Sequence, residues 1–279
     1  MNESNFNETN ERDESQTQEI SGKVEFGIFS GPAVVNELVP FREFDGYAVT
    51  EGDIILGTVE ELRNPDPNVL EENEEQKVRA KEGEEADTTP FGLHVPGIRY
   101  LWHNKTLHYE INPNLPNQSR IEQAMQDITS KTGFRFARRT NQVDYVHIQF
   151  HPSGANSQLG KRGGRQIINI PDWATNGTCA HELMHAIGIY HEQGRPDRDN
   201  FIRIHWTNLA PGWDLQYAKP AGAIPVAQYD YCSIMHYSDT GGAKPGKKAF
   251  TVLRQTSCRV GQRGSLSQSD IQTIKSIYP

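Results

Sequence analysis

The chain has few cysteines, no long apolar stretch and no cluster of basic residues. Its 279 residues include three cysteines, which allow at most one disulfide and exclude a scaffold held together by several bridges. No run of about 18 apolar residues occurs, so no membrane span is predicted. Lysine and arginine never occur more than two in a row, which disfavours nucleic-acid binding.

The start of the chain also lacks the apolar core of a signal peptide. Residues 1–18 are polar and acidic, so no signal for export is visible. Either the protein is not exported by that route, or a native signal is missing from this sequence.

Charge is distributed unevenly along the chain. The net charge is −8, from 28 basic and 36 acidic side chains. Residues 1–89 hold 23 acidic and 7 basic side chains, whereas residues 90–279 hold 13 acidic and 21 basic ones. Opposite signs in the two parts favour binding between them, although an acidic tail that stays in solvent would give the same counts.

The two parts also differ in their residue patterns. Residues 1–22 are polar and predict a disordered acidic tail. Residues 23–57 carry scattered apolar side chains, typical of extended pieces that need another surface to fold on. Residues 58–89 are acidic and suit a linker or an exposed helix. We place the domain boundary near Pro90.

Beyond this boundary, the apolar spacing predicts both strands and helices. We expect strands at 107–111, 143–150 and 166–170, a helix capped by Ser119 and ended by Gly133, a helix over 177–188, and a last helix from Ser267. The order lacks the regular alternation of strands and helices that a parallel sheet requires, which indicates an α+β domain.

One stretch, His-Glu-Leu-Met-His-Ala-Ile-Gly-Ile-Tyr-His-Glu over residues 181–192, has the spacing of metal ligands. On a helix, His181 and His185 share one face, so both imidazoles can reach one ion. Gly188 can take a positive φ and let the chain turn, so that His191 supplies a third nitrogen. Three protein ligands leave a tetrahedral zinc ion one open position, as in catalytic sites, and Glu182 is close enough to act on a water there. A chance match of all five residues has odds on the order of 10⁻⁴.

A second motif, Ser-Ile-Met-His-Tyr over residues 233–237, places Met235 44 residues after His191. Together with Glu192 directly after the third histidine, it resembles the astacin family of the metzincin metalloproteases. Weaker likeness extends the resemblance over about residues 93–279, through the stretches 100–102, 131–136 and 261–267. The resemblance implies a metzincin-type catalytic domain over residues 90–279. Such a domain has a twisted mixed sheet and an active-site helix, then a C-terminal subdomain, and an irregular prosegment precedes it.

The resemblance also implies roles for single residues. Met235 would lie beneath the zinc as an apolar support, and Glu192 would bond with the mature N-terminus or with ordered water. Tyr237 would be a fifth ligand that swings away and stabilises the oxyanion once substrate binds, with ordinary core packing as the alternative. Arg263 resembles a pocket arginine that favours an acidic side chain just after the cleaved bond, with a surface arginine as the alternative.

The cysteines depart from the family pattern. Members commonly carry two disulfides, but Gly133 stands where one cysteine is expected and the second pair is absent. Cys232 and Cys258 either form a different bridge or stay reduced as small buried side chains. Cys179 is expected to face away from the two helix histidines, as a buried thiol and not a ligand.

Residues 23–89 resemble an astacin prosegment with an acidic linker. In Thr-Glu-Gly-Asp over residues 50–53, Asp53 matches the prosegment aspartate that binds zinc and displaces the catalytic water, although Thr50 replaces the usual aromatic residue. A carboxylate oxygen is a competent zinc ligand, and Gly52 permits a close backbone approach. A plain surface turn is the alternative.

These features predict a zinc endopeptidase that is made as a latent precursor. Glu182 would take a proton from the water and pass it to the leaving amine. A peptide or protein substrate would lie extended along a strand edge near residues 155–162. An activating protease would cut around residues 80–98, near Arg79 and Lys81. The resemblance implies a secreted protein.

Two other functions fit part of the sequence. One is a catalytically silent binding protein on the same fold, and the intact Glu182 argues against it. The other is a peptidase of a different metzincin branch, and Glu192 together with Tyr237 argues against that.

Overall fold

The computed structural model describes residues 23–31, 36–68, 70, 92–94, 98–219, 224–226 and 228–279. The predicted acidic tail, residues 71–89 of the linker and most of the expected activation region lie outside the described residues, and with them Arg79 and Lys81. Within the described ranges, no helix combines the length and the apolar character needed to cross a membrane.

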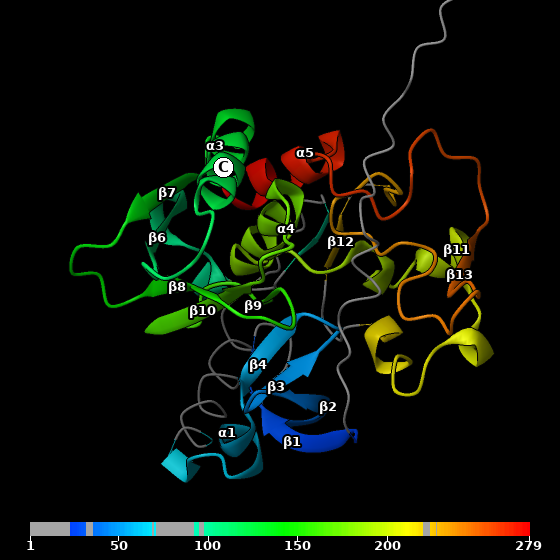
Figure 1. Cartoon of the computed structure of the whole chain (residues 1–279), viewed down its shortest axis with the longest axis horizontal. Helices are drawn as coiled ribbons and strands as arrows, with labels where there is room; N and C mark the ends of the chain where they lie inside the picture. Colours follow the sequence, from blue (N-terminus) through cyan, green and yellow to red (C-terminus); the bar gives the residue numbers. More distant parts are fainter. Residues whose placement is uncertain are drawn as a thin grey trace, which may run out of the picture.

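A nine-stranded sheet runs through the molecule in the order β1-β2-β3-β4-β9-β10-β8-β6-β7 (Figure 1). One half consists of β6 (Thr106–Ile111), β7 (Arg135–Arg138), β8 (Tyr145–Phe150), β9 (Asn156–Gln158) and β10 (Arg165–Ile170). In this half, only β9 is antiparallel to its neighbour β10. The three predicted strands are confirmed as β6, β8 and β10, and the mixed sheet with its helices confirms the α+β fold.

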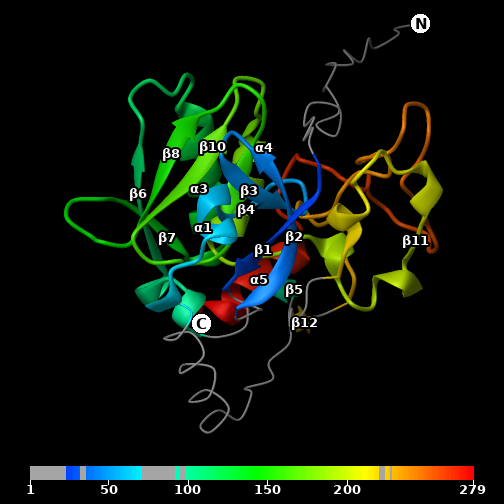
Figure 2. The same cartoon turned by 90° about the horizontal axis from the view of Figure 1, so that it is seen from below.

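The N-terminal segment, residues 23–31 and 36–63, is more regular than predicted. It forms four antiparallel strands and a one-turn helix, namely β1 (Glu25–Phe29), β2 (Glu37–Phe44), β3 (Tyr47–Thr50), β4 (Ile54–Thr58) and α1 (Val59–Arg63). β4 pairs in parallel with β9, so the segment continues the sheet formed by the rest of the chain. Figure 1 shows these blue strands below the green sheet, and in Figure 2 they lie between that sheet and the yellow-to-orange C-terminal part. The edge of β9 thus provides the surface that the extended pieces need.

The helix α3 (Ser119–Thr132) begins differently from the prediction. Its N-cap is Gln118, and the Ser119 hydroxyl donates to Asn117 Oδ1 instead of capping the helix. The expectation of a Ser119 cap is wrong because Gln118 already has helical backbone angles, after a turn at Asn117 with φ of 51°. Gly133 ends the helix with φ of 79°, as predicted.

Two further helices begin with reciprocal caps. In α4 (Asn176–Ala186), the side chains of Thr175 and Thr178 each bond the backbone N–H of the other. In α5 (Gln268–Ile277), Ser267 and Asp270 form the same arrangement, which confirms the predicted start of the last helix. α3, α4 and α5 pack on β6, β8 and β10 through one apolar core.

The C-terminal part has little regular structure. It contains the strand pair β11 (Ile202–Ile204) and β13 (Phe250–Val252), while β12 (Ile224–Val226) pairs with β5 (Gly92–His94). Short 3-10 turns fill much of the rest of the chain: η2 (Ile98–Tyr100), η3 (His103–Lys105), η4 (Glu192–Gly194), η5 (Arg198–Asn200), η6 (Trp206–Asn208) and η7 (Leu215–Tyr217). The core of the C-terminal part is aromatic and is built around Tyr217, Tyr229, Tyr237 and Phe250.

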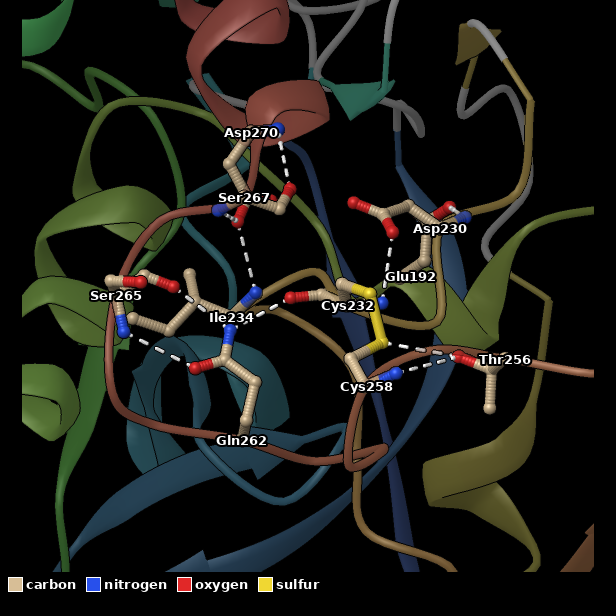
Figure 3. Close-up of a disulfide and its surroundings, with 10 residues drawn as sticks. All are labelled: Glu192, Asp230, Cys232, Ile234, Thr256, Cys258, Gln262, Ser265, Ser267 and Asp270. Atoms are coloured by element: carbon tan, nitrogen blue, oxygen red, sulfur yellow. Dashed lines mark hydrogen bonds between the residues drawn. A yellow bond between two sulfur atoms is a disulfide. The ribbon is translucent and has the colours of Figure 1, made fainter.

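Cys232 and Cys258 form a disulfide in this C-terminal part, and Cys179 is a fully buried thiol that belongs to no disulfide. Figure 3 shows that the bridge joins the chain just before Ile234 to the segment that carries Gln262. The Gln262 amide reinforces this link, because it donates to the Cys232 carbonyl at 2.7 Å. The bridge therefore holds the 258–263 loop against residues 233–237, here called the methionine-containing turn because it carries Met235.

We expect the double variant Cys232→Ser/Cys258→Ser to lose about 3 kcal/mol of unfolding free energy, because the bridge closes a loop across 26 residues. Urea denaturation followed by circular dichroism measures the loss. A reductant should destabilise the parent chain by a similar amount and leave the double variant unchanged. Equal stability of the two chains without reductant would contradict a structural role for the bridge.

Candidate metal centre

The helix α4 and the turn after it bring three histidines together. His181 and His185 lie one turn apart on α4, and Gly188, with φ of 101°, redirects the chain toward His191. The Nε2 atom of His191 lies 3.3 Å from that of His181 and 3.2 Å from that of His185. All three rings are buried, so their Nε2 atoms converge on one enclosed point.

Backbone carbonyls set the tautomer of the two helix histidines. His181 Nδ1 donates to the Ile234 carbonyl at 2.8 Å, and His185 Nδ1 donates to the Ile189 carbonyl at 2.7 Å. A carbonyl oxygen can only accept, so each Nδ1 carries its proton and each Nε2 keeps its lone pair. This is the form in which a histidine binds a metal ion.

A fourth ligand atom comes from the N-terminal segment. The Asp53 carboxylate lies 3.1 Å from His191 Nε2, 3.2 Å from His181 Nε2 and 3.4 Å from His185 Nε2. One ligand atom from each of these four residues falls within 4.8 Å of all the others. Three imidazole nitrogens and one carboxylate oxygen suit a tetrahedral zinc ion.

The electrostatics of this cluster favour a positive charge at its centre. Burial lowers the pKa of His181 and of His185, which keeps both rings neutral. Burial acts in the same direction on His191, but the carboxylates of Asp53 and Glu51 outweigh it and raise its pKa to about 9. Burial of Asp53 would raise its pKa, yet the neighbouring histidines hold it well below its usual range. The Asp53 carboxylate thus draws one positive charge into the cluster, which a proton on His191 supplies in the absence of metal and a divalent cation can supply in its place.

The methionine-containing turn lies directly against the three histidines. Met235 is buried, and its carbonyl accepts from the Glu192 N–H at 3.1 Å. Glu182 is buried on α4 directly after His181. The Glu192 carboxylate accepts from the Asp230 N–H at 2.8 Å, and burial raises its pKa to about 8. These residues therefore surround the candidate ligands, and their predicted roles stay predictions.

The Tyr237 hydroxyl faces the N-terminal segment. It donates to the Glu51 carbonyl, and its ring centroid lies 4.6 Å from that of His191. A Cβ on Gly52, whose φ is 83°, would lie only 2.5 Å from this hydroxyl. Only glycine therefore fits between Glu51 and Asp53 at this point.

Arg263 lies near the same site but bonds to backbone. Its Nη1 donates to the His236 carbonyl at 3.0 Å, and its own carbonyl leaves no room for a side chain at Gly177, at the start of α4. The Arg263 loop therefore packs against both the methionine-containing turn and the metal-binding helix.

Two contacts between buried side chains of the N-terminal segment and the rest of the chain were not predicted. Glu51 Oε2 lies 3.4 Å from His191 Nδ1, and Arg42 is buried with its Nη2 donating to the Pro211 carbonyl at 3.2 Å. Glu51 and Asp53 lie in the turn between β3 and β4, where φ is 48° at Glu51 and 83° at Gly52, so strand alternation gave no signal for Glu51. Nothing local marks Arg42, since its partner lies 169 residues away.

Comparison with known proteins gives this site its context. Residues 95–279 match the sequence model of the astacin peptidase family. Zinc metalloproteinase nas-13 of Caenorhabditis elegans is 33% identical over 198 residues, which cover 67% of this chain and 44% of that protein. High choriolytic enzyme 1 of Oryzias latipes is 37% identical over 161 residues, which cover 57% of this chain and 59% of that protein. The chain thus spans about half the length of these curated relatives.

Solved structures agree with the sequence comparison. The structure of high choriolytic enzyme 1, a hatching enzyme zinc-protease from medaka, aligns with a TM-score of 0.58 and 31% identity, over 70% of this chain and 98% of that one. Myroilysin aligns with a TM-score of 0.51 at 20% identity, which shows a shared fold alone. The family and the four-residue cluster confirm zinc as the cofactor. The chain belongs to the astacin family of zinc metalloproteases.

Proposed function

We propose that this chain is the latent precursor of a secreted zinc endopeptidase, in which the N-terminal segment is the inhibitory prosegment. The observation that carries the proposal is the Asp53 carboxylate, which lies 3.1 to 3.4 Å from the Nε2 atoms of all three histidines. A carboxylate there occupies the position that water and a substrate carbonyl would need. The precursor is therefore silent until the segment leaves.

The pairing of β4 supports this proposal. β4 runs along the free edge of β9, and the Ser157 N–H donates to the Asp53 carbonyl at 2.8 Å. An extended peptide substrate would use the same edge, as peptides do when they add a strand to a sheet. The segment thus blocks both the metal and the strand edge.

The catalytic steps follow from the residues around the site. Bound zinc lowers the pKa of water toward neutrality and polarises a carbonyl. Glu182 takes the proton from the water and passes it to the leaving amine. Once Glu51 is gone, the Tyr237 hydroxyl loses its carbonyl partner and can donate to the oxyanion that forms on the substrate.

Activation and export complete the proposal. An activating protease would cut around residues 80–98, beyond α1 and near the start of the family-matched residues 95–279. The Cys232–Cys258 disulfide supports export, because such bonds persist in oxidising compartments. Arg263 would favour an acidic side chain just after the cleaved bond.

Metal analysis and proteolytic activation test this function. We expect one zinc ion per chain by elemental analysis, peptide cleavage only after limited proteolysis, and loss of cleavage with a chelator that zinc reverses. Zinc at about 100 times its Kd should stabilise the metal-free chain by about 2.7 kcal/mol, seen as a higher Tm. A processed chain that holds zinc and cleaves no peptide in a broad library would refute the peptidase. Equal activity before and after processing would refute the latency.

A further inference from the structure

An apolar seat beside the metal site is filled by a side chain of the N-terminal segment. Ile54 follows Asp53 and is buried, with its side chain packed on Leu159 and Tyr190. Tyr100 and Leu101 close the contact from the side. These four residues, here called the Ile54 seat, belong to the family-matched part of the chain, whereas Ile54 leaves with the prosegment.

An arginine farther along the same edge also holds this segment. The Arg162 guanidinium lies 4.8 Å from the centre of the Phe29 ring, and its Nη2 donates to the Ser30 carbonyl at 2.8 Å. Removal of the segment takes both partners away. Arg162 then offers a charged, fork-shaped group that pairs best with a carboxylate.

The loop that carries both features is anchored to the metal-binding helix. The Gly160 N–H donates to the His185 carbonyl at 2.9 Å, and the Lys161 N–H donates to the Tyr100 carbonyl at 2.7 Å. The Arg162 N–H donates to Gln166 Oε1 at 2.8 Å. None of these bonds involves the N-terminal segment, so the loop stays in place when the segment is gone.

The direction of β9 assigns these features to one side of the cleaved bond. Ser157 lies beside Asp53, and the chain then passes Leu159 before it reaches Arg162. A substrate paired antiparallel to β9, the more stable pairing, has its N-terminal residues on the Leu159 side. β9 ends at Gln158, and Gly160, with φ of 64°, bends the chain, so Arg162 lies beyond the paired strand and faces a substrate side chain farther from the bond than the one in the seat.

We propose that the Ile54 seat and Arg162 select substrates with an apolar side chain within the two residues before the cleaved bond and an acidic side chain farther toward the substrate's N-terminus. This proposal rests on the proposed peptidase function and names its substrate class. The prosegment supplies its own apolar group to the seat, and its Ser30 carbonyl and Phe29 ring substitute for the acidic group at Arg162.

A peptide library tests the two preferences directly. The full chain is processed by limited proteolysis and given peptides varied one position at a time on both sides of the cleaved bond. We expect kcat/KM to rise about tenfold for Leu or Ile over Ser at one of the two positions before the bond. A preference for apolar residues only after the bond, or at no position, would overturn the proposal.

The seat is tested by Leu159→Glu. A carboxylate there should remove the apolar preference and favour Lys or Arg at the same substrate position, a switch that mere damage to folding cannot produce. Val143→Glu makes the same change of charge at a side chain that is 77% exposed, and serves as the control. An unchanged preference in Leu159→Glu would refute the role of the seat.

The charge selection is tested by Arg162→Glu. This variant should reverse the upstream preference from acidic to basic by about fivefold in kcat/KM, whereas Arg162→Lys should keep the acidic preference in weaker form. Arg165→Glu, an exposed arginine three residues away, is the matched control and should change nothing at that position. An identical preference in Arg162→Glu and the parent would remove Arg162 from the proposal.

Binding separates this proposal from the peptidase proposal. The Glu182→Ala chain, processed in the same way, should bind the same peptides with the same preferences, as measured by fluorescence anisotropy. Selective binding without cleavage by the parent would refute the peptidase and support the seat. Cleavage by the parent without any preference among the peptides would support the peptidase and refute the role of the seat.

Discussion

Replacing Glu182 by alanine should lower kcat for peptide cleavage by about 1000-fold in the processed chain, with zinc content unchanged. Glu182 is buried on α4 directly after His181, so the variant keeps the three imidazole ligands and loses only the group that moves the proton. In the proposed binding mode, β9 and the seat hold the substrate and Glu182 does not, so KM should change little. Steady-state kinetics with elemental analysis of the same preparation measure both quantities.

A matched control is available on a neighbouring helix. Glu122→Ala removes a carboxylate from the surface of α3, where it pairs with Arg138 at 2.8 Å. Glu122 has no role in the proposed catalytic steps. It should retain full activity. Undiminished cleavage by Glu182→Ala would show that Glu182 is not the general base.

Replacing Asp53 by alanine should raise the activity of the unprocessed precursor about a hundredfold. The tethered carboxylate occupies its site at a high effective concentration, and the variant abolishes that advantage. Activity should stay below that of the processed chain, because β4 still covers the edge of β9. Cleavage of a fluorogenic peptide before any processing, with gel analysis to show that the chain is intact, measures the effect.

Two further variants sharpen this test of latency. Gly52→Ala should act in the same direction, since its Cβ would lie 2.5 Å from the Tyr237 hydroxyl and push the segment away. Glu43→Ala removes a half-exposed carboxylate of β2 from the same segment and should stay latent. If Asp53→Ala is as silent as Glu43→Ala, Asp53 does not control the precursor.

The histidine cluster was predictable because its geometry is mostly local. His181 and His185 are one helical turn apart, and helix geometry alone places them on one face. Gly188 then provides the positive φ that the turn to His191 needs. The residue types over 181–191 therefore carried nearly all the information needed to propose a zinc site.

Helix ends and strands were predictable to a similar degree, with one clear failure. Ser267 and the glycine at 133 act through bonds that span a few residues, so the sequence identified both helix ends. Ser119 failed because a turn at Asn117 with positive φ started the helix one residue early. Competing local hydrogen bonds decided that cap, and several were compatible with the sequence.

The amino-acid sequence by itself determined the α+β class and the helices that carry the candidate site, and it predicted the three histidine ligands. Only the tertiary structure decided that β4 pairs with β9, that Ile54 fills the seat beside the metal, and that the Tyr237 hydroxyl bonds the Glu51 carbonyl 186 residues away. The physical reason is that each of these contacts depends on which free strand edge and which apolar surface remain once the rest of the chain has packed. Local preferences specify a strand, but they carry no information about its distant partner.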